Sequence, residues 1–229
     1  DLIPITYQNS NADVKAFVGR RGGAVCTSSN ANKVLHWAWT QKGHVLFMPD
    51  QWLGTNTALA MGMPRTQIGL WDRGGANVES LRDCKLVAWP GFCYVHCRFR
   101  VEDVEAARAR YPGARVIVHP ECNSAVVARA DATGTTTGII DYVKTAPAGA
   151  TIVVGTEWHL VHRLGRQYTD RRVVPLRRSS CRTMGMTTPR HLLYVLEGLL
   201  AGNPRNVIAV EAETAEWARV ALERMLRLS

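Results

Sequence analysis

Residues 115–122, RVIVHPEC, place three chemically active side chains directly behind a short apolar run. The run has the length and the β-branched content of a buried strand. Strands that are apolar on both faces are typical of parallel sheets covered by helices. Such a strand does not need His119, Glu121 or Cys122 at its exit. The stretch therefore predicts an α/β fold with polar chemistry at the carboxyl ends of its strands.

Similar apolar runs recur along the 229-residue chain, separated by helical stretches. Strands are predicted at 2–7, 23–28, 44–49, 67–71, 85–90, 115–120, 151–156, 172–176 and 206–210. This alternation predicts repeated three-layer αβα units with short parallel sheets. Because the pattern restarts near residue 113, we expect two domains, residues 1–100 and residues 101–229, the second including the last strand and helix.

Two apolar stripes at helical spacing near the end of the chain are predicted to be core. The first consists of Leu192, Leu193, Val195, Leu196, Leu199 and Leu200, and the second of Trp217, Val220, Ala221 and Met225. We expect neither stripe to carry chemistry.

Composition restricts the possible functions. The net charge of +9 favours anionic partners, from nucleic acid to small phosphates and carboxylates. No zinc-finger or RNP-type motif is present, so nucleic-acid binding rests on charge alone, and the absence of a P-loop or GxGxxG disfavours nucleotides. The apolar runs are too short for a membrane span, and the six cysteines favour a reducing, cytoplasmic location. The start at Asp1 resembles a chain cut upstream.

Two loop cysteines could share a metal. Cys93 follows a Pro-Gly turn, and Cys181 lies in the polar loop SSCRTMG. Cys93, His96 and Cys97 alone are a weak zinc signal, and a single loop thiol is more often inert. Because both loops follow strands of different units, a shared site is reasonable, and distant thiolates suit an iron–sulfur cluster better than Mg²⁺ or Ca²⁺.

The pair His119 and Glu121 points to one side of the chain by the two-residue period of a strand. Such a pair can bind a polar substrate and move protons, although a lone histidine is more often structural. Cys122 points to the other side, and we expect no role for it. Hydroxyl-rich turns at 26–31 and 134–138 lead into helices, where they either bind phosphate or carboxylate or merely cap the helix.

Together these motifs resemble the quinolinate synthase family, from the first residue to the last and in the family's order. The matching stretches are TYQNSNADVKA, VCTSSNA, LFMPDQWLG, VAWPGFCYVHCRF, RVIVHPEC, ADATGTTTGII, VVGTEWHLVHRL, CRTM and ALERML. The resemblance implies pseudo-symmetric α/β domains around a central site. It also implies condensation of iminoaspartate with dihydroxyacetone phosphate to quinolinate, with an open iron of a [4Fe–4S] cluster as Lewis acid.

The resemblance also implies roles for individual residues. Cys93 and Cys181 are expected to be metal ligands, His119 and Glu121 to be catalytic and to bind substrate, and Tyr7, Asn9, Ser28 and Thr136 to bind substrate. Within this set, Ser28 would hold a substrate carboxylate and Thr136 the distal anionic group. An L-aspartate oxidase or dehydrogenase would supply the iminoaspartate, and no nucleic-acid or membrane partner is expected.

The family's N-terminal domain, with its first cluster cysteine, has no counterpart in this sequence. Cys26 and Cys84 are poor replacements, because Cys26 has its own equivalent in the family and Cys84 lies in a linker. Two alternatives therefore stay open. One is a catalytically incomplete protein of the same ancestry that binds an anion or a metal, and the other is a basic nucleic-acid-binding module.

Overall fold

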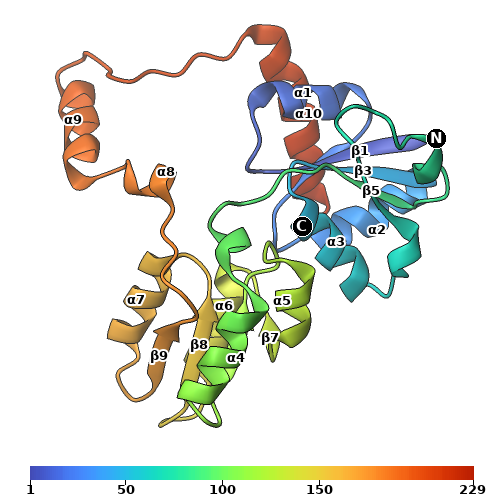
Figure 1. The fold of residues 1–229 in the computed structure, drawn as a ribbon. Coiled ribbons are helices and arrows are strands. Elements are labelled where there is room, and N and C mark those ends of the chain that lie inside the picture. The colour runs from blue at the N-terminus through green and yellow to red at the C-terminus, as the bar shows by residue number, and fades with distance from the viewer.

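The fold contains two fully parallel sheets, as a computed structural model describing residues 1–229 shows (Figure 1). The strand order is β2-β1-β3-β5-β4 in the first sheet and β7-β6-β8-β9 in the second. The first sheet consists of β1 (Leu2–Tyr7), β2 (Ala24–Cys26), β3 (His44–Met48), β4 (Ile68–Leu70) and β5 (Leu86–Ala88). The second consists of β6 (Arg115–Val118), β7 (Ala132–Thr133), β8 (Thr151–Gly155) and β9 (Arg172–Pro175).

Helices connect the strands. They are α1 (Ala12–Arg20), α2 (Ala31–Gln41), α3 (Gln51–Ala60), α4 (Val101–Arg110), α5 (Ser124–Arg129), α6 (Thr136–Thr145), α7 (Trp158–Gln167), α8 (Arg182–Gly185), α9 (Pro189–Leu200) and α10 (Ala212–Arg227). Three short 3₁₀ turns, at Arg65–Gln67, Glu79–Leu81 and His96–Arg98, complete the connections. No helix combines the length and the apolarity that a membrane span requires.

Successive residues of a strand point to opposite faces of the sheet, and helices cover both faces of the first sheet. On one face, Ile5 of β1 shares a core with Leu35 of α2 and Leu53 of α3. On the other, Val18 of α1 shares a core with Ala221 of α10. The helix that ends the chain therefore completes the three layers of the first unit (Figure 1).

The second sheet is built in the same way. Val118 of β6 packs with Val104 of α4 and Val126 of α5, whereas its neighbour Ile117 faces Ile139 of α6 on the other side. Each β-branched side chain of the strand is thus buried under a helix. The expected α/β class with repeated αβα units is confirmed, and the division of the chain at residue 100 stays a prediction. The last helix, α10, was expected in the second domain but packs against α1 and β2 of the first unit.

Two expectations near the end of the chain are wrong. Residues 206–210 form no strand, because they lie in an extended crossing segment that pairs with neither sheet, and Ile208 is 86% exposed. The leucine stripe of α9 is not core, since no other element covers it, and Leu200 is 90% exposed. In the second predicted stripe, Ala221 is buried and Trp217 is half-buried, so the helix does pack by this face.

The difference between the two helices gives a stability prediction. Leu35→Ala is expected to lower the free energy of unfolding by about 2–5 kcal/mol, because it leaves a cavity in a fully buried core. Leu193→Ala, on the exposed face of α9, should change it by no more than about 0.5 kcal/mol. Chemical denaturation followed by circular dichroism measures both. Equal losses would contradict the packing described above.

Candidate active site

The carboxyl ends of both sheets open onto one cavity of about 1010 Å³. All but one of the residues expected to bind a metal or a substrate lie on its wall, namely Tyr7, Asn9, Cys93, His119, Glu121, Thr136 and Cys181. The expectation that polar strand ends converge is confirmed, whereas the individual roles stay predictions. A smaller cavity of about 470 Å³, beside Arg108 and Asp131, has no cysteine or histidine on its wall.

Ser28 is the residue that does not line the cavity. Burial, and after it the charge of Glu121, raises the pKa of the Tyr7 phenol, while the neighbouring Ser28 side chain acts in the opposite direction. Tyr7, which does line the cavity, therefore stays protonated at neutral pH.

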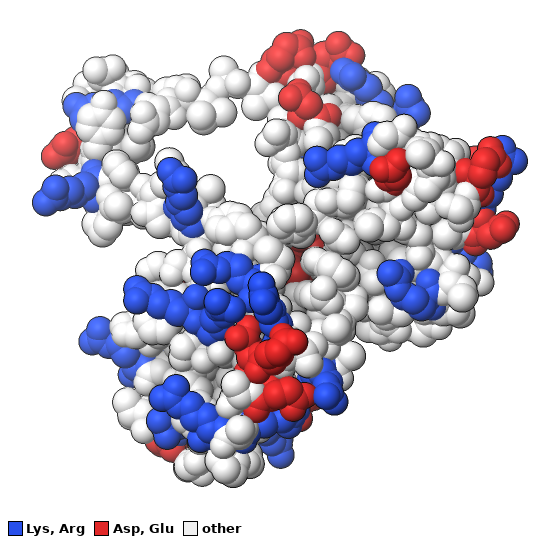
Figure 2. All heavy atoms as spheres, viewed as in Figure 1, with Lys and Arg blue, Asp and Glu red and all other residues white.

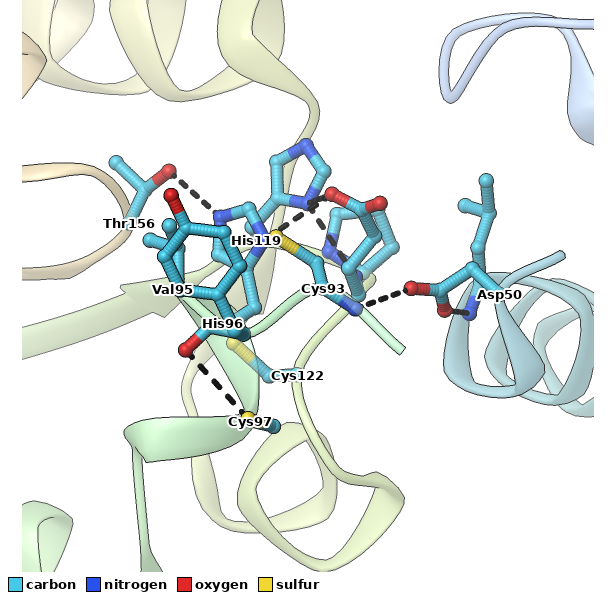
Figure 3. Close-up of polar contacts among 12 residues, drawn as sticks. Asp50, Cys93, Val95, His96, Cys97, His119, Cys122 and Thr156 are labelled. Carbon is cyan, nitrogen blue, oxygen red and sulfur yellow. Dashed lines mark hydrogen bonds and ion pairs between the residues drawn. The ribbon is translucent and has the colours of Figure 1, made fainter. Parts of the chain in front are cut away.

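The loop that carries Cys93 is fixed to the end of β3. Asp50 Oδ1 accepts the N–H of Leu53, which caps α3, and Asp50 Oδ2 accepts the N–H of Cys93, each at 2.8 Å (Figure 3). A Cβ atom on Gly91 would lie only 2.1 Å from the carbonyl oxygen of Pro49. Glycine is therefore required for the Pro-Gly turn to approach β3 and bring Cys93 to the cavity.

Two imidazoles and a carboxylate form the buried centre of the site. The rings of His96 and His119 stack with centroids 4.3 Å apart and an interplanar angle of 9°. Glu121 Oε2 lies 3.0 Å from His96 Nδ1 and 3.3 Å from His119 Nδ1. His96 Nε2 lies 3.1 Å from the hydroxyl of Thr156 (Figure 3). Because His119 Nδ1 accepts the N–H of Glu121, a neutral His119 ring carries its proton on Nε2.

Burial sets the charges of these groups. It lowers the pKa of His96 to about 4 and that of His119 to about 3, where the neighbouring His96 adds to the effect. It also raises the pKa of Glu121, and it raises the pKa of Asp50 to about 7 with the charge of Glu121 adding to it. Both imidazoles are therefore neutral at neutral pH, the form that binds metals or accepts protons.

The thiol of Cys93 completes a candidate metal site. Ligand atoms of Cys93, His96 and Glu121 all lie within 4.8 Å of one another. Burial, and then the charge of Glu121, raises the pKa of Cys93 to about 11. A thiolate beside this carboxylate thus needs a cation close by, and a bound metal ion supplies one. These donors fit a thiolate-bound metal.

Residues of both units hold Cys181 at the start of α8. Its N–H donates to Glu157 Oε1 at 3.2 Å, and its sulfur lies 3.4 Å from the Tyr94 hydroxyl and 3.1 Å from that of Thr183. Burial raises the pKa of Cys181, but the bonds with Thr183 and Tyr94 outweigh it and lower the pKa overall. The site thus favours the Cys181 thiolate, and Tyr94 links this loop to the one that carries Cys93.

The other four cysteines lie off the cavity wall. Cys26 and Cys84 are buried in hydrophobic cores of the first unit. The Cys97 sulfur lies 3.5 Å from the carbonyl oxygen of Tyr94, apart from that of Cys93 (Figure 3). Cys122, for which no role was expected, is buried with its sulfur 3.8 Å from the carbonyl oxygen of Gly155.

Asn56 of α3 ties the first unit to the loop after β6. Its Nδ2 donates to the carbonyl oxygens of Pro120 and Cys122, each at 2.7 Å, and its Oδ1 accepts the hydroxyl of Ser124 at 2.6 Å. The side chain is buried, so water cannot replace these bonds. One amide therefore fixes the position of the His-x-Glu loop relative to the first sheet.

Sequence reasoning assigns no role to Asp50, Asn56 or Tyr94, and it considers His96 only in a weak zinc signal with Cys93 and Cys97. Asp50 and His96 follow strands, so the rule that ligands collect at strand ends places both at the site but gives neither a role. Asn56 lies inside a helix and Tyr94 inside a loop, and no local pattern distinguishes either one.

Comparison with known proteins gives a consistent result. Residues 1–227 match the family described as "Quinolinate synthetase A protein". Three curated relatives, each named "Quinolinate synthase", come from Acidobacterium capsulatum (46% identical over 99% of this chain), Corynebacterium glutamicum (49% over 98%) and Haloarcula marismortui (45% over 100%). The chain spans 63%, 59% and 62% of the lengths of these proteins, less than two thirds of each.

The Asn56 contacts generate a prediction. Asn56→Asp keeps the shape of the side chain but replaces its N–H donors by oxygen. It should cost about 1–3 kcal/mol of unfolding free energy for each of the two carbonyls left without a donor. Asn32→Asp, the same change at an exposed position of α2, is the matched control and should cost no more than about 0.5 kcal/mol. Urea denaturation compares the two, and similar values would mean that the Asn56 bonds do not hold the loop.

Proposed function

The chain belongs to the quinolinate synthetase A family, and we propose that it carries the condensation of iminoaspartate with dihydroxyacetone phosphate to quinolinate, with release of phosphate and water. The observation that carries the proposal is the single cavity lined by Cys93, Cys181, His119 and Glu121. These residues supply thiolates for a metal and a base beside it, which the condensation requires.

The charge of the protein supports anionic substrates. One substrate carries two carboxylates and the other a phosphate. The cavity wall includes Arg73 and Arg163, and the chain has a net charge of +9. Figure 2 shows basic side chains gathered over the second unit, which contributes one side of the cavity. Such a field raises the local concentration of anions and favours their binding.

Binding would use hydroxyl and amide groups at the strand ends. Tyr7 and Asn9 follow β1, and Ser28 lies beside Tyr7. Thr136 begins α6, where backbone N–H groups and the positive end of the helix dipole favour an anion. We assign a substrate carboxylate to the Tyr7 side, through Ser28, and the distal anionic group to Thr136.

We assign proton transfer to His119 and Glu121. Nε2–H of a neutral His119 can donate to a substrate oxygen as it leaves. Burial raises the pKa of Glu121, which makes the carboxylate a stronger base for a proton of the substrate. The short sequence distance between the two fixes their relative positions, and the amide of Asn56 holds the loop on which both lie.

We assign Cys93 and Cys181 as two thiolate ligands of a [4Fe–4S] cluster. When bound, a cluster of this kind with one iron free of thiolate acts as a Lewis acid on a substrate oxygen or nitrogen. Since the remaining cysteines lie off the cavity wall, a third thiolate would come from outside this sequence. The cluster would need the reducing cytoplasm, and an enzyme that oxidises L-aspartate would supply the iminoaspartate.

Cluster assembly tests the ligand assignment. After anaerobic reconstitution with iron and sulfide, the chain fused to the part of the Acidobacterium capsulatum relative that it does not match should keep the broad visible absorption of an iron–sulfur cluster through desalting. Cys93→Ser and Cys181→Ser should each lose it, because either thiolate is needed to retain the cluster. Cys97→Ser removes a thiol from the same turn as Cys93 and should retain it. Loss in the Cys97 variant, or retention in either of the other two, would contradict the assignment.

Turnover tests the proposed reaction. Release of quinolinate is measured with this chain alone and with the chain fused to the part of the Acidobacterium capsulatum relative that it does not match. In the active form, His119→Ala should lower kcat by about 10²–10⁴-fold without loss of the cluster. His36→Ala, exposed on α2, is the control and should leave kcat unchanged. If a fusion that holds its cluster releases no quinolinate, the proposed reaction is wrong.

A further inference from the structure

His96 Nδ1 is a buried polar atom that makes no hydrogen bond. It lies 3.0 Å from Glu121 Oε2, but the two groups lack the alignment of a donor and an acceptor. The side chains of His96 and Glu121 are only 9% and 6% exposed, so water does not replace the missing partner. A close N–O pair that is not a hydrogen bond requires an explanation.

The contact of His96 Nε2 with Thr156 limits the possible explanations for the unpaired Nδ1. If Nε2–H donates to the Thr156 hydroxyl at 3.1 Å, the Nδ1 lone pair of His96 faces a carboxylate oxygen. Two acceptors at this distance repel each other unless a cation lies between them. If Thr156 instead donates to Nε2, Nδ1 carries a proton that is not aimed at Glu121. Of the two tautomers, the first needs only a shared cation to satisfy every group.

The thiol of Cys93 provides a third ligand, within 4.8 Å of the other two ligand atoms. Nitrogen and oxygen ligands of one tetrahedral Zn²⁺ lie about 3.3 Å apart, given bond lengths of about 2.0–2.2 Å. The observed N–O distance of 3.0 Å is close to this value. One thiolate, one imidazole and one carboxylate also form a donor set that zinc accepts.

We propose that Cys93, His96 and Glu121 bind a single divalent transition-metal ion, with Zn²⁺ as the best fit. Cys93 binds as the thiolate and releases its proton to solvent, so the ion and its two anionic ligands form a neutral centre. Thr156 accepts the Nε2–H of His96 and thereby fixes the tautomer that presents Nδ1 to the metal. The fourth position faces the cavity, as in zinc sites that keep one position open.

This site shares Cys93 with the proposed cluster but does not use Cys181. One thiolate cannot complete both centres, so a protein loaded with Zn²⁺ should resist cluster assembly. The competition rests on the proposed function, whereas the metal site itself does not. The two centres are distinguishable because the cluster needs Cys181 and not His96, whereas the single ion needs His96 and not Cys181.

Anaerobic titration of the metal-free chain with Co²⁺, followed by competition with Zn²⁺, tests the site. Cobalt bound by a thiolate gives a ligand-to-metal charge-transfer band, which reports on Cys93 directly. The chain should bind one Co²⁺ with this band, and Zn²⁺ should displace it. Cys93→Ser should abolish the band, and His96→Ala should weaken Co²⁺ binding by more than about 100-fold, beyond the effect of removing an outer partner. Glu121→Gln, which changes the volume little, decides the matter if His96→Ala does not fold.

Two variants give the controls. Cys181→Ser should bind Co²⁺ as the unaltered chain does, and Thr156→Val should weaken binding by about 10–100-fold. If Cys181→Ser loses the band, the two thiols hold the ion together and the proposed triad is wrong. If the band survives in both His96→Ala and Glu121→Gln, the ion lies elsewhere and the proposal is likewise wrong. Prior loading with Zn²⁺ should reduce the iron taken up on reconstitution. Unchanged iron uptake would mean that Zn²⁺ and the cluster do not compete, and it would leave the metal site itself in place.

Discussion

The candidate site depends on helix α3, which holds two separate loops against one cavity. At its start, the Asp50 carboxylate caps the helix with one oxygen and binds the Cys93 backbone with the other. One and a half turns later, the Asn56 amide binds two carbonyls of the loop that carries Glu121. Parallel strands bring polar residues to one edge of each sheet, but these contacts make the two edges share a cavity.

The electrostatics of the cavity follow from this geometry. Neutral imidazoles, a buried carboxylate and a thiol whose pKa is raised by burial and by Glu121 form a centre that lacks positive charge. A bound metal centre would supply the missing positive charge, and Cys93 is a ligand of both proposed centres. Together with Cys181 it would bind a cluster, and together with His96 and Glu121 it would bind a single ion. Occupancy of Cys93 is therefore the point at which the proposed activity can be gained or blocked.

The sequence predicts the αβα layers of the fold and the positions where most strands end, because both follow from the local pattern of apolar residues. RVIV alternates between two helical layers, and His119 and Glu121 follow it into the cavity as expected. The contacts of Asn56 and Tyr94 were not predictable, since each joins segments more than 60 residues apart. The stripe of α9 shows the limit of periodicity, which identifies an apolar face but not whether another element covers it. Residues 206–210 have strand propensity but no partner strand.

We propose that Cys93 and Cys181, from loops of different units, face one inorganic centre. An X-ray structure of the anaerobically reconstituted chain, with anomalous differences recorded at the iron absorption edge, measures this directly. One compact group of iron positions should lie in the cavity, within bonding distance of both sulfur atoms. Iron bound to only one of these thiols, or located at Cys84 or Cys97 outside the cavity, would contradict it.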